Sequence, residues 1–229
     1  EAVDHLDERV AAITQLRREP AARPVIQNLE IDRPDGMALL RGLDLSLDRG
    51  DSLLIAGASG TGKSTLLRTL AGVWPYARGV VQLPGAAVLF VPQRPYLPIG
   101  TLREALLYPQ RSTLDDAVLQ QALRDVGLER FAEALDTVED WAQTLSGGEQ
   151  QRIAFARILL RQPKWLFLDE ASSALDEPSE LALYRLIRQR LPDTAIVSVG
   201  HRSTLRAFHE RQLQLDGIGG WQLSAMAAV

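Results

Sequence analysis

The chain opens with a helical pattern of apolar residues and changes to a strand pattern after its first 24 positions. Apolar side chains recur there at spacings of three and four, which predicts an amphipathic helix within residues 1–19. These side chains are Val3, Leu6, Val10 and Ile13. Pro20 and Pro24 break the pattern, and the three residues between them indicate a linker.

The following segments predict a hairpin, a buried strand and a helix. Residues 25–31 and 39–47 have the apolar pattern of strands, and Asp35-Gly36 between them is typical of a hairpin turn. The continuous apolar run at 53–56 predicts a strand that is buried on both faces. A helix over about 63–71 follows and ends at Gly72.

The middle of the chain is predicted to be helical, and strands return after it. A short strand at 88–91 precedes a stretch, from about 97 to 160, whose pattern is helical almost throughout, with Gly127 as a helix C-cap. Two residue pairs have the spacing of a helix N-terminal capping box: Thr101 with Glu104, and Thr113 with Asp116.

The last third adds strands at 165–168 and 195–199, a helix over about 178–191 between them, and a final hairpin at 212–215 and 221–223. The predicted fold class is α/β, with an antiparallel β-subdomain at the start and a helical insertion in the middle.

Composition and charge exclude several classes of protein. The 229 residues carry 25 Lys and Arg against 29 Asp and Glu, a net charge of −4, which disfavours a sequence-independent nucleic-acid binder. The absence of cysteine excludes disulfides, zinc–thiolate sites and thiol catalysis. The longest run without Asp, Glu, Lys or Arg, residues 79–93, is shorter than the roughly 18 apolar residues of a membrane-spanning helix.

Residues 57–64 match the phosphate-loop pattern G-x-x-x-x-G-K-S between a predicted strand and a predicted helix. Glycines allow a tight turn whose N–H groups point at phosphate oxygens, and the helix N-terminus adds partial positive charge. Lys63 is expected to reach the β- and γ-phosphates of ATP, and the Ser64 hydroxyl to coordinate Mg²⁺. The predicted nucleotide contacts are Gly57, Ser59, Gly60, Thr61, Gly62, Lys63, Ser64 and Thr65. An accidental Lys-Ser in a glycine-rich turn is the alternative, and the strand and helix context disfavours it.

Two acids end the apolar run at 165–168. Unpaired buried charge is costly, so Asp169 and Glu170 are not explained by packing. A Mg²⁺-bound nucleotide explains both: Asp169 suits the coordination sphere of the metal, and Glu170 polarises the attacking water. Without the phosphate loop, an ordinary strand-end turn would be the better interpretation.

The segment Ser146-Gly147-Gly148-Glu149-Gln150 opens a predicted helix. Ser146 and Glu149 have capping-box spacing, but a capping box does not explain two adjacent glycines, which weaken a helix. Glycines fit a helix start that lies against the phosphates of a ligand.

With this motif the chain resembles the ATP-binding cassette (ABC) family from Val25 to its end, with motifs in the family's order. Gln93 matches the glutamine loop, Ser173-Ala174-Leu175-Asp176 the D-loop and His201 the switch histidine. The resemblance implies a P-loop NTPase core at 25–229 with an inserted helical subdomain at about 95–160.

The resemblance also implies a head-to-tail dimer that sandwiches two ATP–Mg²⁺. Ser146 and Gly148 would contact the γ-phosphate bound by the partner's Lys63, and Asp176 would couple the two sites. Gln93 would sense the metal and the attacking water, and His201 would hold the γ-phosphate and the water. Because all these residues match the family pattern, a symmetric homodimer is expected.

A finer resemblance is carried by Val73-Trp74-Pro75-Tyr76, by Pro92–Tyr96 around Gln93, and by Gly200-His201-Arg202. These segments look like the peroxisomal fatty-acyl transporter branch and its bacterial SbmA/BacA-like relatives. In those proteins a membrane domain precedes the ATPase. Residues 1–24 would then be an extension from a membrane domain upstream of Glu1, which places the domain on the cytoplasmic face of a membrane, the inner membrane in a bacterium.

The sequence departs from the pattern of many family members at the residue expected to contact the base of the nucleotide. Many exporters stack adenine on an aromatic residue upstream of the phosphate loop, whereas here no aromatic residue precedes Trp74 and Arg33 lies near that place. We therefore expect weak base selectivity.

Two other functions are compatible with the cassette motifs. A soluble cassette ATPase acting on DNA or ribosomes is disfavoured because only 82 positions separate Ser64 from Ser146, too few for a long coiled coil, and because a second cassette and basic linkers are absent from this sequence. A nucleotide-binding scaffold without turnover is opposed by the intact Glu170 and His201.

Overall fold

The computed structural model describes residues 15–110 and 113–226, which form two compact units. The first unit comprises residues 15–90, 164–169 and 195–226, and the second comprises 91–163 and 170–194 without 111–112. In the described part of the chain, no helix has the length and apolar character needed to cross a lipid bilayer.

Strand β1 (Leu16–Pro20) corrects the prediction of a helix that extends to residue 19. It pairs in parallel with β5 (Ala77–Leu83), a strand that the sequence pattern did not predict. The Arg18 guanidinium donates to the carbonyl oxygens of Thr69 (2.9 Å) and Leu70 (2.6 Å). The apolar residues of the predicted helix, Val3 to Ile13, lie outside the described residues.

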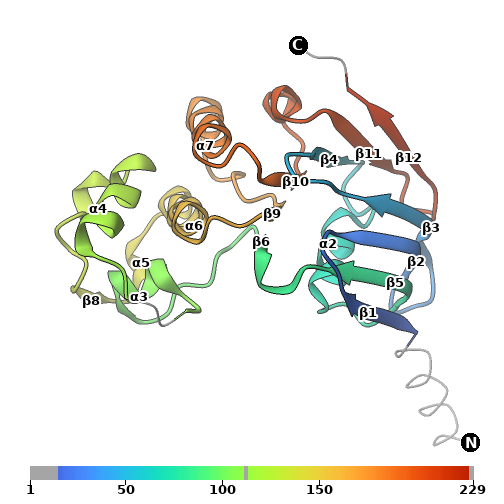
Figure 1. Ribbon diagram of the computed structural model, residues 1–229, viewed down its shortest axis with the longest axis horizontal. Helices are drawn as coiled ribbons and strands as arrows, with labels where there is room; N and C mark the ends of the chain where they lie inside the picture. Colours follow the sequence, from blue (N-terminus) through green and yellow to red (C-terminus); the bar gives the residue numbers. More distant parts are fainter. Residues whose placement is uncertain (1–14, 111–112, 227–229) are drawn as a thin grey trace, which may run out of the picture. The chain divides into compact units, whose positions relative to one another are not determined.

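The first unit contains a four-stranded sheet of order β1-β5-β2-β3 (Figure 1). The antiparallel hairpin of β2 (Val25–Asp32) and β3 (Ala38–Ser46) confirms the predicted antiparallel start of the domain. Its turn contains Gly36 with φ of 84°, a left-handed conformation that glycine adopts without a steric penalty.

The same unit contains a six-stranded sheet of order β12-β11-β4-β10-β9-β6. Its strands are β4 (Ser52–Ala56), β6 (Val88–Val91), β9 (Trp165–Asp169), β10 (Ala195–Val199), β11 (Arg211–Leu215) and β12 (Trp221–Ala225). The neighbours from β11 to β9 run parallel, and β11 with β12 forms the predicted antiparallel hairpin. The central strands are almost completely buried, as their continuous apolar runs predict.

Helix α2 (Lys63–Ala71) contributes to the core of this unit together with strands of both sheets. It begins after Gly62 and ends at Gly72, as predicted, and both glycines are left-handed. The hydrophobic core includes Leu29, Leu43, Leu53, Ile55, Leu66, Phe167 and Leu213. Two short 3₁₀ helices, η1 (Gly85–Ala87) and η3 (Ser203–Phe208), occupy connecting segments.

The second unit is helical, but less so than predicted. Its elements are α3 (Leu102–Leu107), α4 (Asp116–Asp125), η2 (Glu129–Phe131), α5 (Trp141–Thr144), α6 (Gly147–Arg161) and α7 (Glu177–Arg190), with the two-residue strands β7 (Gly100–Thr101) and β8 (Val138–Glu139). Loops separate these elements, so the prediction of nearly continuous helix over 97–160 was wrong. Short apolar repeats in loops that pack on a core have the same spacing as helical ones.

The helix ends of this unit confirm one predicted cap and correct another. Thr101 and Glu104 form a complete capping box at α3. Helix α4 instead begins after Asp115, without a side-chain cap, so Thr113 is not its first residue. The C-cap of α4 is Val126, and Gly127 follows it with φ of 75°.

Candidate functional site

The phosphate loop joins β4 to α2 in a conformation that requires glycine. A Cβ atom at Gly57, where φ is 146°, would lie 2.6 Å from the Leu215 carbonyl oxygen and 2.6 Å from Thr61 Oγ1. Gly62 precedes the first helical residue, and no side chain caps the helix. The first N–H groups of α2 are thus presented at a bare helix N-terminus, which is a favourable position for phosphate oxygens.

Lys63 holds its ammonium group inside this loop. Its residue is 5% exposed, and Nζ donates to the carbonyl oxygens of Gly57 (2.9 Å) and Ala58 (2.7 Å). Thr61 closes the loop through a hydrogen bond from its hydroxyl to the same Ala58 carbonyl (2.9 Å). The positive charge is therefore fixed beside the glycine turn, as recognition of phosphate requires.

The remaining predicted loop residues differ in exposure. Ser59 and Gly60 are exposed, and Thr65 is half-buried in the first turn of α2.

Ser64 and Asp169 meet although they are 105 positions apart. The Ser64 hydroxyl donates to Asp169 Oδ1 at 2.6 Å, because α2 and the end of β9 are neighbours in one unit. A hydroxyl and a carboxylate are the hard oxygen donors that Mg²⁺ prefers, so these residues fit the predicted metal. Among the described residues, no group of three or more His, Cys, Asp or Glu could hold a metal ion.

The turn between β2 and β3 brings Arg33 to the phosphate loop. One guanidinium nitrogen of Arg33 lies 3.3 Å from the Gly60 carbonyl oxygen. The backbone of the turn is fixed because the Arg33 N–H donates to the Met37 carbonyl (2.8 Å) and the Met37 N–H donates to the Asp35 carboxylate (3.0 Å). Arg33 is therefore positioned by the hairpin.

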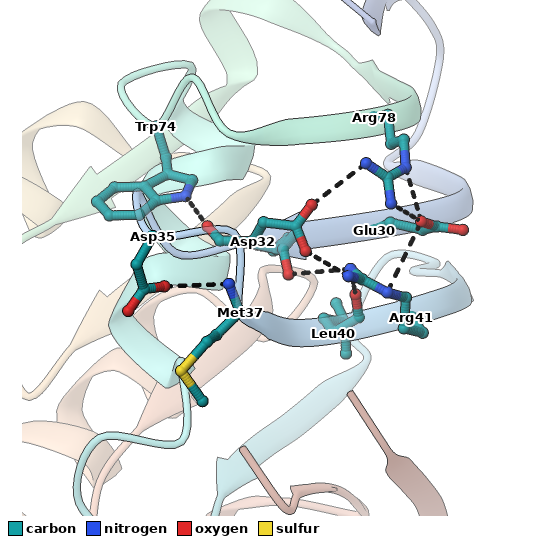
Figure 2. Close-up of polar contacts among 9 residues, drawn as sticks. Glu30, Asp32, Asp35, Met37, Leu40, Arg41, Trp74 and Arg78 are labelled. Atoms are coloured by element: carbon teal, nitrogen blue, oxygen red, sulfur yellow. Dashed lines mark hydrogen bonds and ion pairs between the residues drawn. The ribbon is translucent and has the colours of Figure 1, made fainter. Parts of the chain in front are cut away.

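Figure 2 shows that ion pairs and an indole hold the strands beside this turn. Arg78 on β5 contacts Glu30 (2.6 Å) and Asp32 (3.2 Å), and Arg41 on β3 pairs with the other oxygen of Asp32. The Trp74 indole N–H donates to the Asp32 carbonyl at 3.0 Å. Asp32 is thus fixed by its backbone and by its side chain directly before Arg33.

In the second unit, Glu170 and Gln93 form a contact of their own. The Gln93 amide donates to Glu170 Oε2 at 3.1 Å. Glu170 has φ of 49°, the left-handed conformation that non-glycine residues adopt rarely and that concentrates at functional sites. The contact joins the predicted glutamine loop to the predicted general base.

Gln151 is a buried polar residue beside the candidate site, and the sequence analysis did not single it out. It is 3% exposed, and its amide nitrogen lies 3.0 Å from the Gln93 carbonyl oxygen and 3.2 Å from Ser173 Oγ. Its amide oxygen accepts from the Ala174 N–H at 2.9 Å. One buried side chain therefore ties the glutamine loop to the D-loop. Gln151 is four residues before Phe155 and seven before Ile158, which are both buried, so the helical spacing did indicate that Gln151 lies on the buried face of α6.

The signature segment forms a complete capping box at α6. The Ser146 hydroxyl accepts from the Glu149 N–H, and the Glu149 carboxylate accepts from the Ser146 N–H (3.0 Å). Burial opposes ionisation of Glu149, but hydrogen bonds from Ser146 and an ion pair with Arg130 outweigh it and lower the pKa of Glu149. A Cβ atom at Gly148 would lie 3.3 Å from the Ala174 carbonyl oxygen, so the D-loop is a second reason for glycine there.

The last two predicted residues lie at the ends of secondary structure. Asp176 caps α7 by accepting from the Ser179 N–H at 2.8 Å. His201 is exposed in the segment after β10. The described structure places Lys63, Ser64, Asp169 and His201 in the first unit, and Gln93, Ser146, Gly148, Glu170 and Asp176 in the second.

A family model described as "ABC transporter" matches residues 40–173, more than half of the chain and the range from β3 to the D-loop. The chain belongs to the ABC transporter family. ATP-binding proteins of ABC transporters are ATPases, and the chain is an ATPase domain of this class.

In curated relatives, the matching ABC domain is part of a longer protein. An uncharacterized ABC transporter ATP-binding protein of Haemophilus influenzae is 49% identical over 195 residues, which are 85% of this chain and 33% of the relative. The human lysosomal cobalamin transporter ABCD4 is 42% identical over 225 residues, 89% of this chain and 37% of the relative. The chain spans about a third of the length of these curated relatives.

A solved structure shares the fold. The structure of a bacterial Atm1-family ABC exporter with ATP bound superposes with a TM-score of 0.78 at 25% sequence identity, over 98% of this chain and 44% of that one. This confirms the predicted α/β fold class.

Proposed function

We propose that this chain is the ATPase domain that powers a membrane transporter and that it works as a head-to-tail homodimer. Two ATP–Mg²⁺ would lie between the phosphate loop of one protomer and the signature segment of its partner. The observation that carries this proposal is the 2.6 Å contact of Ser64 with Asp169 beside the buried Lys63, because it gathers a cation and oxygen donors at a bare helix N-terminus.

The residues have distinct roles in this proposal. Lys63 binds the β- and γ-phosphates, and Ser64 and Asp169 hold Mg²⁺, with Gln93 as a further contact. Bound Mg²⁺ would neutralise charge on the phosphates during transfer. Glu170 orients the attacking water and accepts its proton, and the Gln93 amide at 3.1 Å orients the Glu170 carboxylate.

Four further residues complete the proposed machinery. His201 contacts the γ-phosphate, Ser146 and Gly148 contact the γ-phosphate of the other protomer's nucleotide, and Asp176 connects the two sites. Asp176 is well suited to a connecting role because its cap fixes the start of α7 while the residue remains exposed.

The test is the substitution Glu170→Gln, which keeps the shape of the side chain and removes the base. We expect hydrolysis to fall by about 10²–10⁴-fold while ATP binding persists. Size-exclusion chromatography with ATP should then show a stabilised dimer. Glu133→Gln, at an exposed position on the same unit, is the matched control. Normal hydrolysis by the Glu170→Gln variant would overturn the assignment of the base.

We also propose that base selectivity is weak. Arg33 is fixed by the β2–β3 turn, 3.3 Å from the Gly60 carbonyl, and it takes roughly the place expected for the aromatic residue on which many exporters stack adenine. A guanidinium plane can stack on any base. Rates of ATP and GTP hydrolysis should be similar, and a strong preference for ATP would contradict this proposal.

The proposed partner is a transmembrane domain that precedes this chain in one polypeptide, with the ATPase on the cytoplasmic face of the membrane. This is supported by the relatives, of whose length the chain covers about a third. Fractionation of cells that express the complete gene tests it: the ATPase should sediment with membranes and resist extraction by salt, whereas release by salt alone would contradict a covalent membrane domain.

A further inference from the structure

The segment that carries His201 is fastened to the sheet by a second histidine. Residues 200–210 connect β10 to β11 within the first unit, and η3 occupies most of this connection. His201 lies exposed at its start, whereas His209 at its end is 5% exposed. Burial of an imidazole requires partners for both ring nitrogens.

Both partners of the His209 ring lie on this connection or on the strand before it. Nδ1 is 2.7 Å from the carbonyl oxygen of Leu205 in η3, and Nε2 is 2.9 Å from the hydroxyl of Ser198 on β10. A carbonyl oxygen can only accept, so Nδ1 carries the proton. In the neutral ring Nε2 then accepts from the Ser198 hydroxyl, which is completely buried.

Leu205 transmits this anchoring back to the residue before His201. Its side chain is 2% exposed and covers Gly200 so closely that a Cβ atom there would lie 2.2 Å from Leu205 Cδ1. His209 thus holds the backbone of Leu205, and Leu205 holds Gly200. The contacts run from β10 through His209 and Leu205 to the peptide that positions His201.

We propose that His209 is a positioning residue for hydrolysis: its Nδ1–H fixes Leu205, and through Leu205 and Gly200 it sets the place of the His201 side chain. The inference rests on the proposed role of His201 at the γ-phosphate. It assigns the buried histidine a purpose beyond filling the core, since an apolar side chain would fill the same space without directing η3.

Two substitutions at His209 separate the two hydrogen bonds. Asparagine presents an amide N–H near the position of Nδ1 and keeps the bond to Leu205, whereas glutamine reaches the position of Nε2 and keeps the bond to Ser198. With the intact protein, His209→Asn should retain most of the wild-type kcat. His209→Gln should lower kcat by about 10- to 100-fold, the effect of a displaced catalytic group, and leave KM for ATP little changed.

The outcomes distinguish positioning from simple stabilisation. Each variant loses one buried hydrogen bond, so a purely structural His209 would give similar thermal midpoints and similar kcat values in both, and that result would overturn the proposal. Wild-type kcat in His209→Gln would also overturn it. If neither variant folds, Gly200→Ala keeps residue 209 as histidine but forces the Leu205 side chain to shift, and it should lower kcat with ATP binding intact. Unchanged kcat in that variant would count against the proposal.

His201→Ala is assayed in parallel as the reference for the proposed function. If His201→Ala hydrolyses ATP normally, the role of His201 is wrong and the proposed function fails at that residue. If His201→Ala is inactive while His209→Gln is fully active, the positioning role of His209 fails alone.

Discussion

Replacing Gln151 by methionine tests whether one buried amide holds the glutamine loop and the D-loop together. Methionine has nearly the same shape and volume, so the change removes hydrogen bonds without opening a large cavity. Gln151 makes three bonds between 2.9 and 3.2 Å, to Gln93, Ser173 and Ala174. At about 1 kcal/mol for each, the variant should lose about 3 kcal/mol of unfolding free energy.

The measurement is urea unfolding, followed by circular dichroism and by tryptophan fluorescence, to which Trp141, buried in the same unit, contributes. Gln143→Met is the control, because Gln143 is exposed on α5 and its replacement should change the unfolding free energy by less than about 0.5 kcal/mol. Hydrolysis should also fall in Gln151→Met, since the Gln93 carbonyl loses its donor. A loss of less than about 1 kcal/mol would refute the anchoring role.

Three further predictions concern the loop, the metal and the signature helix. Gly57→Ala should destabilise the protein by about 1–3 kcal/mol more than Gly60→Ala in thermal unfolding without nucleotide, because only the Gly57 Cβ atom would meet other atoms within 4 Å; equal losses would disprove this cause. Asp169→Asn should weaken the Mg²⁺ dependence of ATP binding in titration calorimetry, while binding without metal persists. Hydrogen bonds lower the pKa of Glu149, so its capping box stabilises α6 fully above the ordinary Glu pKa of about 4.3 and loses that contribution as the pH falls through the lowered value. In Glu149→Gln, the thermal midpoint should therefore fall less steeply as the pH is lowered. An unchanged pH dependence of the midpoint would contradict this prediction.

The phosphate loop was predictable because its determinants are local. Its eight positions, residues 57–64, follow one another between a strand that is a continuous apolar run and a helix, and the structure reproduces the bounds of α2. The contact of Ser64 with Asp169 could also be predicted, because the sequence analysis assigned both side chains to the same Mg²⁺ ion, so they were expected to lie close together.

Non-local pairing explains what the sequence did not reveal. Strands β1 and β5 lie side by side through backbone hydrogen bonds to distant partners, and such pairing leaves little trace in the alternation of side chains. Gln151 escaped notice because glutamine is usually exposed on a helix. Its partners lie on two loops, the glutamine loop and the D-loop, which only the fold brings together.

The contact of Arg18 with the end of α2 connects strand β1 to this helix. The guanidinium grips the carbonyl oxygens of Thr69 and Leu70 at the helix end opposite to the phosphate loop, and β1 itself is held along its length by β5. A displacement of β1 would therefore act on the last turn of α2 as well as on the edge of the sheet. Lys63 and this last turn lie at opposite ends of one nine-residue helix, about 14 Å long, so a single helix connects β1 to the phosphate loop.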